Sequence, residues 1–259
     1  MGIINTTPDS FSDGGRFDSM EKAFQHARQM IKDGVDILDI GGESTRPGAK
    51  NIDQNEELER TIPLIQAIRQ ISDIPISIDT NKPEVMREAV AAGASMINSI
   101  DALRQEDALA TAADLAVPVC LVHMQGSPKT MQKQPRYHDV VVEVMQFLRE
   151  RIAAALSAGI AHHHIIVDPG FGFGKTLQHN LQLLKSLAEL KALGVPLLVG
   201  LSRKRMIGTI IDKPVSQRLF GSIAAGVIAT MQGADIVRVH DVAETVDAIK
   251  MVRAVNQIQ

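Results

Sequence analysis

The sequence has very few of the residues on which disulfide frameworks, zinc sites and base-stacking surfaces are built. Its 259 residues include one cysteine, one tyrosine, seven phenylalanines and no tryptophan. A single cysteine, Cys120, excludes a disulfide framework and a structural zinc site made of cysteines. It lies in the apolar run PVCLV, which predicts a small buried side chain in a reducing compartment. So few aromatic residues cannot form the stacking surface of a single-stranded nucleic-acid binder.

The sequence also lacks an excess of charge and any long apolar run. It has 27 basic and 30 acidic residues, a formal net charge of −3, which argues against a nucleic-acid or membrane-surface partner. No apolar run reaches the roughly 18 residues of a membrane span. The first residues lack the basic and apolar regions of a signal peptide. We therefore expect a soluble, cytoplasmic protein.

What the sequence does contain is a regular alternation of short apolar runs and helical patterns. The eight runs lie at residues 2–5, 36–42, 75–79, 95–100, 118–124, 164–170, 196–200 and 235–241. Such runs are typical of strands buried on both faces of a parallel sheet. A (β/α)8 barrel typically has about 250 residues, so we predict an α/β fold, a (β/α)8 TIM barrel, in one domain over residues 1–259. An open doubly wound sheet is the alternative, because strand order cannot be derived from the sequence.

The segments between the runs carry signals for helix starts. Asp18 and Glu21 have the spacing of a capping box, and Asn81 and Asp241 each precede a helical pattern. Three histidines at 162–164 come just before a strand, at its N-terminal end, and predict a surface turn.

Polar residues stand at or just after the carboxyl end of the predicted strands. They are Asn5, Glu43, Asp79, Asn98, His123, Asp168, Ser202, Lys204, Arg238 and His240. In a barrel these ends converge on one mouth, which carries the active site. An open sheet would spread the same residues along an edge, so their placement favours the barrel.

Two polar loops carry oxygen ligands and hydrogen-bond donors. Residues 5–15, NTTPDSFSDGG, contain Asn and Asp oxygens, which are hard ligands suited to Mg²⁺. A loop of ordinary turn formers is the alternative. Residues 41–48, GGESTRPG, combine paired glycines with Ser44, Thr45 and Arg46, which are suitable donors to phosphate oxygens.

Arg238 and His240 lie two positions apart on the last strand, so both face the same side. An arginine in an apolar strand is rarely buried without a partner. An anionic ligand is the natural partner, and a structural salt bridge to Glu43 or Asp241 is the alternative.

Asp79, Asn98 and Asp168 each end an apolar strand. A buried carboxylate is costly unless it accepts hydrogen bonds. Two carboxylates and an amide in one mouth therefore suit a ligand with several N–H donors, such as an aminopyrimidone ring. A metal site is the alternative, but no histidine joins these acids at ligand spacing.

Five ordered motifs resemble the dihydropteroate synthase family: NTTPDSFSDGG, DILDIGGESTRPG, DPGFGFGK, GLSRK and RVHD. The resemblance covers the whole chain and implies a TIM barrel that acts in folate synthesis. Its members join p-aminobenzoate to 6-hydroxymethyl-7,8-dihydropterin diphosphate and release pyrophosphate with the help of Mg²⁺. The resemblance also implies a homodimer, sulfonamides as competitors, and a missing segment ahead of the first strand.

The resemblance assigns roles to individual residues. Those that would hold the pterin are Asp79, Asn98, Asp168 and Lys204. Those that would hold the diphosphate are Thr45, Arg46, Arg238 and His240, with Asn5 as the Mg²⁺ ligand. Those around the aminobenzoate would be Phe11, Pro47, Phe173, Ser202, Lys204 and Arg205. The catalytic residues would be Asp79, Asp168, Lys204, Arg238 and His240.

One position departs from the family pattern, which usually has Ile-Asn-Asp after the fourth strand. Here Ser99 follows Asn98, and Asp101 comes two residues later. Two alternative functions remain. A methyltetrahydrofolate:corrinoid methyltransferase shares the pterin-holding acids but handles no diphosphate. A non-catalytic pterin-binding paralogue would have no use for the loop at 5–15.

Overall fold

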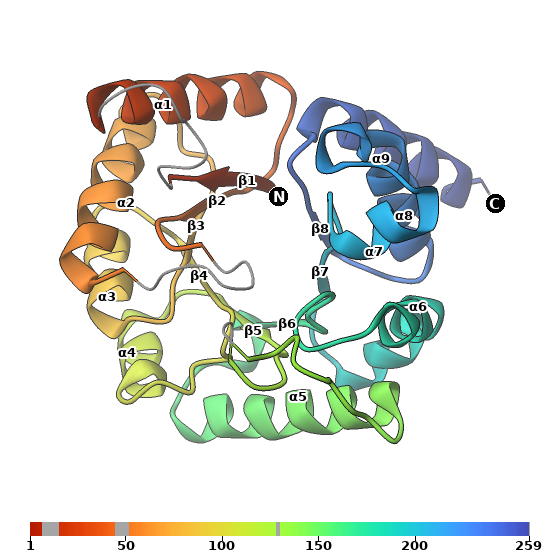
Figure 1. The fold of residues 1–259 in the computed structure, drawn as a ribbon. Coiled ribbons are helices and arrows are strands. Elements are labelled where there is room, and N and C mark those ends of the chain that lie inside the picture. Colours follow the sequence, from red (N-terminus) through yellow and green to blue (C-terminus); the bar gives the residue numbers. More distant parts are fainter. Residues whose placement is uncertain (7–15, 45–51, 128–129, 259) are drawn as a thin grey trace.

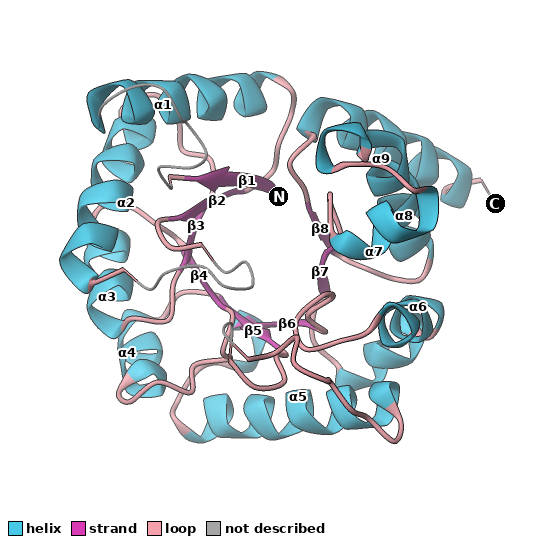
Figure 2. Cartoon of the chain, viewed as in Figure 1, coloured by secondary structure: helices cyan, strands magenta, loops and turns pink. Residues whose placement is uncertain are grey.

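A ring of parallel strands is enclosed by a ring of helices in the computed structural model, which describes residues 1–6, 16–44, 52–127 and 130–258 (Figures 1 and 2). The strands of these residues are β1 (Gly2–Asn5), β2 (Leu38–Gly41), β3 (Ile76–Asp79), β4 (Met96–Ser99), β5 (Val119–Val122), β6 (Ile165–Asp168), β7 (Leu198–Gly200) and β8 (Ile236–Arg238). Each strand lies within one of the apolar runs predicted to form it.

Backbone pairing closes the ring of strands into a barrel. β1 to β6 pair in chain order, and β7 pairs with β8. Single parallel bridges join these two sets, one between Val167 and Leu197 and one between Gly2 and Val239. The Val239 N–H donates to the Met1 carbonyl over 2.9 Å. The predicted (β/α)8 barrel is therefore confirmed, and the open sheet is excluded.

Helices cover the outer face of the barrel (Figure 2). In the described residues they are α1 (Arg16–Lys32), α2 (Gln54–Arg69), α3 (Pro83–Ala91), α4 (Ala108–Leu115), α5 (Val140–Ser157), α6 (Leu177–Lys185), α7 (Arg205–Ile211), α8 (Leu219–Met231) and α9 (Val242–Asn256). Short 3-10 turns occur at His162–His164, where none of the histidines is buried, as well as at Leu187–Leu193 and Val215–Gln217. Among the described helices, none is long and apolar enough to cross a membrane.

The predicted helix starts are only partly right. α1 is described from Arg16, so Asp18 lies inside the helix and is not its N-cap. Lys82, not Asn81, is the N-cap residue of α3, because a proline occupies the first helical position. Asp241 is the N-cap residue of α9, as predicted, although its side chain makes no cap bond there.

Apolar side chains form a layer on each side of the strands. Outward-facing strand residues pack against the helices in the larger cluster, which includes Ile40, Ile78 and Ile97. A smaller cluster fills the inside of the barrel, and its buried members are Met1, Met96, Cys120, Val122, Ile166 and Leu198. Runs that are apolar throughout are expected when both faces of a strand are buried. The polar mouth of the barrel therefore stands on a packed apolar floor.

Candidate functional site

A small recess lies at the carboxyl ends of the strands. Its volume is about 30 Å³, which is room for about one water molecule. The described residues that line it are Asp79, Asn98, Ile100, Val122, Asp168, Phe173, Gly200, Lys204 and Arg238. Six of these nine are predicted site residues. A larger cavity of about 510 Å³ opens at the N-terminal ends of β1, β2 and β8, and no predicted site residue lines it.

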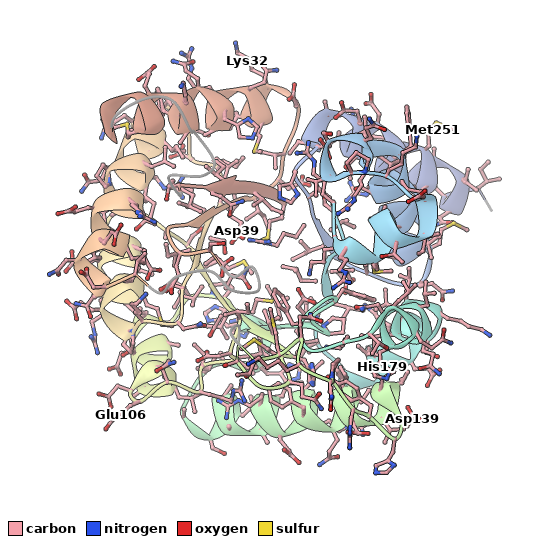
Figure 3. All side chains as sticks on the ribbon, viewed as in Figure 1. Lys32, Asp39, Glu106, Asp139, His179 and Met251 are labelled. Carbon is pink, nitrogen blue, oxygen red and sulfur yellow. The ribbon has the colours of Figure 1, made fainter. Side chains whose placement is uncertain are left out.

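Strand register brings residues from distant parts of the sequence to one level. Asn5 pairs with Gly41, Gly41 with Asp79, and Asp79 with Asn98. Alternate strand residues face the same side, so Asp39, two positions before Gly41, also faces inward and lies one level deeper. Figure 3 labels Asp39 inside the ring of strands.

Two inward-facing glycines leave the space in which the polar side chains meet. A methyl group at Gly41 would lie 3.8 Å from Oδ2 of Asp79 and 3.9 Å from Oδ1 of Asn5. A methyl group at Gly200 would lie 3.9 Å from Nζ of Lys204. These distances are ordinary van der Waals contacts, so both glycines lie directly beside the polar side chains of the mouth. Asn5 and Asp79 both lie next to Gly41.

Arg238 is held by two acidic residues at the base of the recess. Its Nε donates to Oδ2 of Asp39 over 2.6 Å, and its Nη2 donates to Oδ2 of Asp79 over 2.9 Å. Arg238 therefore does form a salt bridge within the protein, but not with Glu43 or Asp241. The guanidinium is nevertheless still at the mouth, because it lines the recess.

Asp39 is absent from the site residues predicted from the sequence. It is 0% exposed, and its Oδ1 has no hydrogen-bond partner in the described part of the chain. The Oδ1 of Asn98 is also buried without a partner there. Buried acceptors are almost always satisfied, so both atoms call for a donor from a ligand or water. The sequence offers one sign of this residue. Asp39 is an acid inside the apolar run 36–42, and it lies two positions before Gly41, so both residues face the same side of the strand.

Burial shifts the pKa values of the ionisable groups around the recess. It raises the pKa of Asp79 to about 7, although Arg238 opposes this shift. It also raises the pKa of Asp168, against the attraction of Lys204. The pKa of Lys204 is lowered to about 8, again chiefly by burial, while Asp168 acts to raise it. Such shifts are characteristic of groups that act on a ligand.

Asp168 and Phe173 lie at opposite ends of the short loop that follows β6. The Oδ1 of Asp168 accepts a hydrogen bond from the Gly170 N–H over 2.7 Å. The Phe173 ring borders the recess, and Nζ of Lys204 lies 4.4 Å from its centre. Ile100, Met124 and Met131 form a buried cluster behind this ring. The loop thus supplies both a carboxylate and an apolar wall.

The remaining predicted residues differ in how close they lie to the recess. Ser202 is 6% exposed, and its Oγ lies 3.0 Å from Nδ1 of His240. The backbone N–H of His240 also donates to this hydroxyl over 3.2 Å. Arg205 is exposed at the first residue of α7 and does not line the recess. The remaining predicted residues, Phe11, Thr45, Arg46 and Pro47, lie outside the described residues.

Ser99, where the sequence departs from the family pattern, belongs to a buried hydrogen-bond network. Ser99 is fully buried, and its hydroxyl lies 2.8 Å from Oδ1 of Asp101. The Leu103 N–H donates to the same hydroxyl over 3.0 Å. Asp101 therefore places a carboxylate beside the Ser99 hydroxyl, and the network holds the loop that follows Asn98.

The amide oxygen of Asn5 fits the Mg²⁺ ion that the sequence motifs imply. Mg²⁺ usually takes one or two protein oxygens and completes its shell with water and substrate phosphates. Among the described residues, no group of three or more His, Cys, Asp or Glu side chains could hold a metal ion. A single amide oxygen at the mouth fits a metal whose shell is completed by water and a bound diphosphate.

Comparison with known proteins agrees with this geometry. The profile of a family described as pterin binding enzyme matches residues 1–240. Dihydropteroate synthase of Escherichia coli (strain K12) is 54% identical over 254 residues, covering 98% of this chain and 90% of the relative. This chain belongs to the dihydropteroate synthase family. Dihydropteroate synthase of Haemophilus influenzae is 52% identical, covering 98% of this chain and 92% of the relative.

Solved structures of dihydropteroate synthases have the same fold. The Yersinia pestis enzyme in a sulfonamide complex superposes with a TM-score of 0.96 at 50% identity, covering 100% of this chain and 94% of that one. The Xanthomonas albilineans enzyme with 4-aminobenzoic acid gives a TM-score of 0.95 at 53% identity, covering 100% and 93%. The family, the TIM barrel and the transferase activity of a dihydropteroate synthase, all predicted from the sequence, are confirmed.

Proposed function

We propose that this chain joins p-aminobenzoate to 6-hydroxymethyl-7,8-dihydropterin diphosphate, giving 7,8-dihydropteroate and pyrophosphate in folate synthesis. The observation that carries the proposal is the meeting of Asp79, Asn98, Asp168 and Lys204 at one recess. Carboxylate and amide oxygens accept hydrogen bonds from the N–H groups of a pterin ring, and an ammonium donates to its oxygen.

The two carboxylates explain how the carbon–oxygen bond to the diphosphate is broken. Departure of the diphosphate leaves a positive charge on the methylene that spreads into the pterin ring. Asp79 and Asp168, accepting ring N–H bonds, stabilise this charge more in the transition state than in the ground state. Neither residue needs to form a covalent bond to the substrate.

The departing diphosphate is stabilised by Arg238 and His240, together with Thr45 and Arg46. In the free protein Nη2 of Arg238 donates to Oδ2 of Asp79. A pterin N–H that binds this oxygen would release that nitrogen for a phosphate oxygen. When bound at Asn5, Mg²⁺ would neutralise charge on the diphosphate.

The aminobenzoate lies against the apolar wall of Phe173, near Ser202 and Lys204, with Phe11 and Pro47 from the two loops. Its amine is neutral near pH 7, so the protein has only to position it for attack on the methylene carbon. The Xanthomonas albilineans enzyme with bound 4-aminobenzoic acid and the Yersinia pestis sulfonamide complex support this site. Sulfonamides should therefore compete with the aminobenzoate.

Release of pyrophosphate tests the proposed function. The protein is mixed with the pterin diphosphate, p-aminobenzoate and Mg²⁺, and both pyrophosphate and 7,8-dihydropteroate are measured. We expect equal amounts of both products. Pterin binding without either product would support the non-catalytic paralogue. Methyl transfer from methyltetrahydrofolate to a corrinoid would instead support the methyltransferase.

A homodimer belongs to this proposal, and an exposed apolar face supports it. Phe220, Ile228 and Met231 lie on one face of α8 and are 82%, 46% and 69% exposed. Met251 is 67% exposed on neighbouring α9, where Figure 3 shows it at the outer edge. Apolar surfaces of this kind mark protein interfaces, and we propose a second copy of this chain as the partner. The cytoplasmic location stays a prediction.

Replacing Phe220 by glutamate should convert the dimer to a monomer, because it places a charge in the apolar face. Sedimentation or light scattering measures the mass in solution. Val142→Glu is the matched control, because Val142 is 61% exposed on α5, away from this face. A wild-type protein that is monomeric at all concentrations would contradict the dimer.

The shifted pKa values predict a narrow pH optimum. Pterin binding needs ionised Asp79 and protonated Lys204, so kcat/KM should rise as the pH increases through about 7 and fall above about 8. Asp79→Asn should remove the contribution of Asp79 to the acid limb and leave that of Asp168, whose pKa burial also raises. Lys204→Arg should move the fall to higher pH, because arginine stays charged. Initial rates across this range measure both limbs, and a flat wild-type profile would contradict the assignment.

Arg205 provides a separate test of the aminobenzoate site, in which its guanidinium would attract the substrate carboxylate. We expect Arg205→Ala to raise the KM for p-aminobenzoate several-fold, since an exposed ion pair is weak. The KM for the pterin diphosphate should not change. High salt should reduce the difference from wild type. An unchanged KM at low ionic strength would make Arg205 an ordinary surface residue.

A further inference from the structure

A buried lysine next to the recess has no part in the function proposed so far. Lys175 is 3% exposed and does not line the recess. Its Nζ lies 2.8 Å from Nδ1 of His123 and donates to the carbonyl oxygens of Gly170 and Phe173 over 3.0 and 3.2 Å. Burial lowers the pKa of Lys175 well below its usual value, against the attraction of Asp168. An ammonium has three N–H donors and a neutral amine has two, so both carbonyl oxygens have a donor in either protonation state.

His123 is a buried, neutral ring whose Nδ1 lies next to this lysine. It is 5% exposed, and its ring packs edge-on against Phe147 with the ring centres 4.8 Å apart. Burial and the charge of Lys175 lower the pKa of His123 to about 2. The ring is therefore neutral, and Nδ1 accepts a hydrogen bond from Nζ of Lys175 when the ring hydrogen is on Nε2.

The two carbonyl groups that Lys175 binds belong to the loop that carries Asp168 and Phe173. Gly170 donates its N–H to Oδ1 of Asp168 and accepts from Lys175 with its carbonyl oxygen. It has a φ of +68°, and a methyl group there would lie 1.8 Å from the carbonyl oxygen of His123. The loop is thus pressed against the end of β5, and Gly170 links the lysine directly to the carboxylate.

We propose that Lys175, together with His123, is a positioning residue. Its hydrogen bonds restrain the loop after β6 and so hold Asp168 and Phe173 in their binding geometry. This inference rests on the proposed function, in which Asp168 binds the pterin and Phe173 the aminobenzoate. One buried nitrogen restrains both ends of the loop. The spacing between the two substrate sites therefore depends on a residue that touches neither substrate.

Removing the donors without removing the side chain tests this role. Lys175→Met keeps the length of the side chain but removes the lysine donor from the Phe173 carbonyl and from Nδ1 of His123. The Gly170 carbonyl keeps only its bond from the Phe173 N–H, over 3.1 Å. We expect kcat/KM for both substrates to fall by about 10- to 100-fold, the effect of a small misplacement of reacting groups. Lys185→Met, on the exposed face of α6, is the matched control and should behave as wild type.

A pair of substitutions at His123 separates positioning from simple stability. His123→Asn keeps an acceptor near the position of Nδ1, whereas His123→Leu has none. We expect the asparagine variant to retain kcat and both KM values within about two-fold, and the leucine variant to resemble Lys175→Met. Rates are measured well below the melting temperature of each variant. If Lys175→Met fails to fold, equal activities of the two His123 variants would overturn the proposal.

Amide hydrogen exchange tests whether Lys175 restrains this loop, without relying on catalysis. The backbone N–H groups of residues 168–175 should exchange faster in Lys175→Met and His123→Leu than in wild type, Lys185→Met or His123→Asn. A folded Lys175→Met variant with wild-type exchange and wild-type kinetics would overturn the proposal. If wild type releases no pyrophosphate, the proposed function fails, and the exchange rates still decide whether Lys175 holds the loop.

Discussion

Replacing Asp168 by asparagine should lower kcat/KM by about 10²-fold, the scale of losing one preorganised electrostatic contact in an active site. The amide keeps an oxygen that can accept from the Gly170 N–H, as Oδ1 of Asp168 does now over 2.7 Å. Its NH₂ group would oppose a ring N–H of the pterin, and the negative charge that stabilises the developing cation would be lost. Pyrophosphate release at varied substrate concentrations measures the effect.

The stability of the Asp168→Asn variant distinguishes a catalytic from a structural role. Burial raises the pKa of Asp168, which means that folding disfavours its charged form. A neutral amide of the same size should therefore leave the melting temperature unchanged or raise it. Near-normal turnover would remove Asp168 from the mechanism. A parallel loss of activity and melting temperature would make it a structural residue.

Replacing Arg238 by methionine should lower the free energy of unfolding by roughly 3 kcal/mol, the cost of leaving a buried charge without its partner. Asp39 is fully buried, one of its oxygens has no partner among the residues that the structure describes, and the other is bound to Arg238. Denaturant unfolding measures this loss. The double variant Asp39→Asn, Arg238→Met should recover much of the stability, because the unpaired charge is gone. Equal stability of wild type and Arg238→Met would show that the pair contributes nothing.

The same Arg238 variant tests the binding of the diphosphate. Calorimetry should show a loss above about 1.5 kcal/mol for the pterin diphosphate, since guanidinium–phosphate contacts are charge-assisted. Pterin without the diphosphate should bind nearly as before. Equal losses for both ligands would mean that Arg238 acts only through the protein fold.

The strands and the mouth could be predicted from the sequence because both depend on local patterns. A strand buried on both faces is apolar throughout, and all eight strands of the described residues lie in such runs. Barrel closure could not be predicted in this way. It depends on pairing between residues as distant as Gly2 and Val239, and the sequence does not specify strand order.

The missed residues depend on packing that a linear pattern does not contain. Asp39 lies within an apolar run, and only the register with Gly41 and Asp79 shows that it faces the site. Arg238 was predicted to bind an anion, but its partners in the free protein come from β2 and β3. Lys175 is the last residue of the motif DPGFGFGK, yet its role requires His123, which lies 52 residues away.

The barrel is closed where the two-stranded set, β7 and β8, meets the six-stranded set, and residues of the site lie on both sides of these two junctions. In the described residues, β7 and β8 each share one residue pair with the neighbouring strand of the other set, whereas the pairs within each set share three or four. Backbone hydrogen bonds of Met1, Ile3 and Val239 strengthen the contact between β1 and β8. Lys204 and Arg238 lie in this two-stranded sector, while Asp39, Asp79 and Asp168 lie in the six-stranded one. The ion pairs of Arg238 therefore join the two sets of strands through side chains. A pterin held between carboxylates on one side and Lys204 on the other would add a further link between the two sets of strands. Substrate binding and closure of the barrel would then stabilise each other.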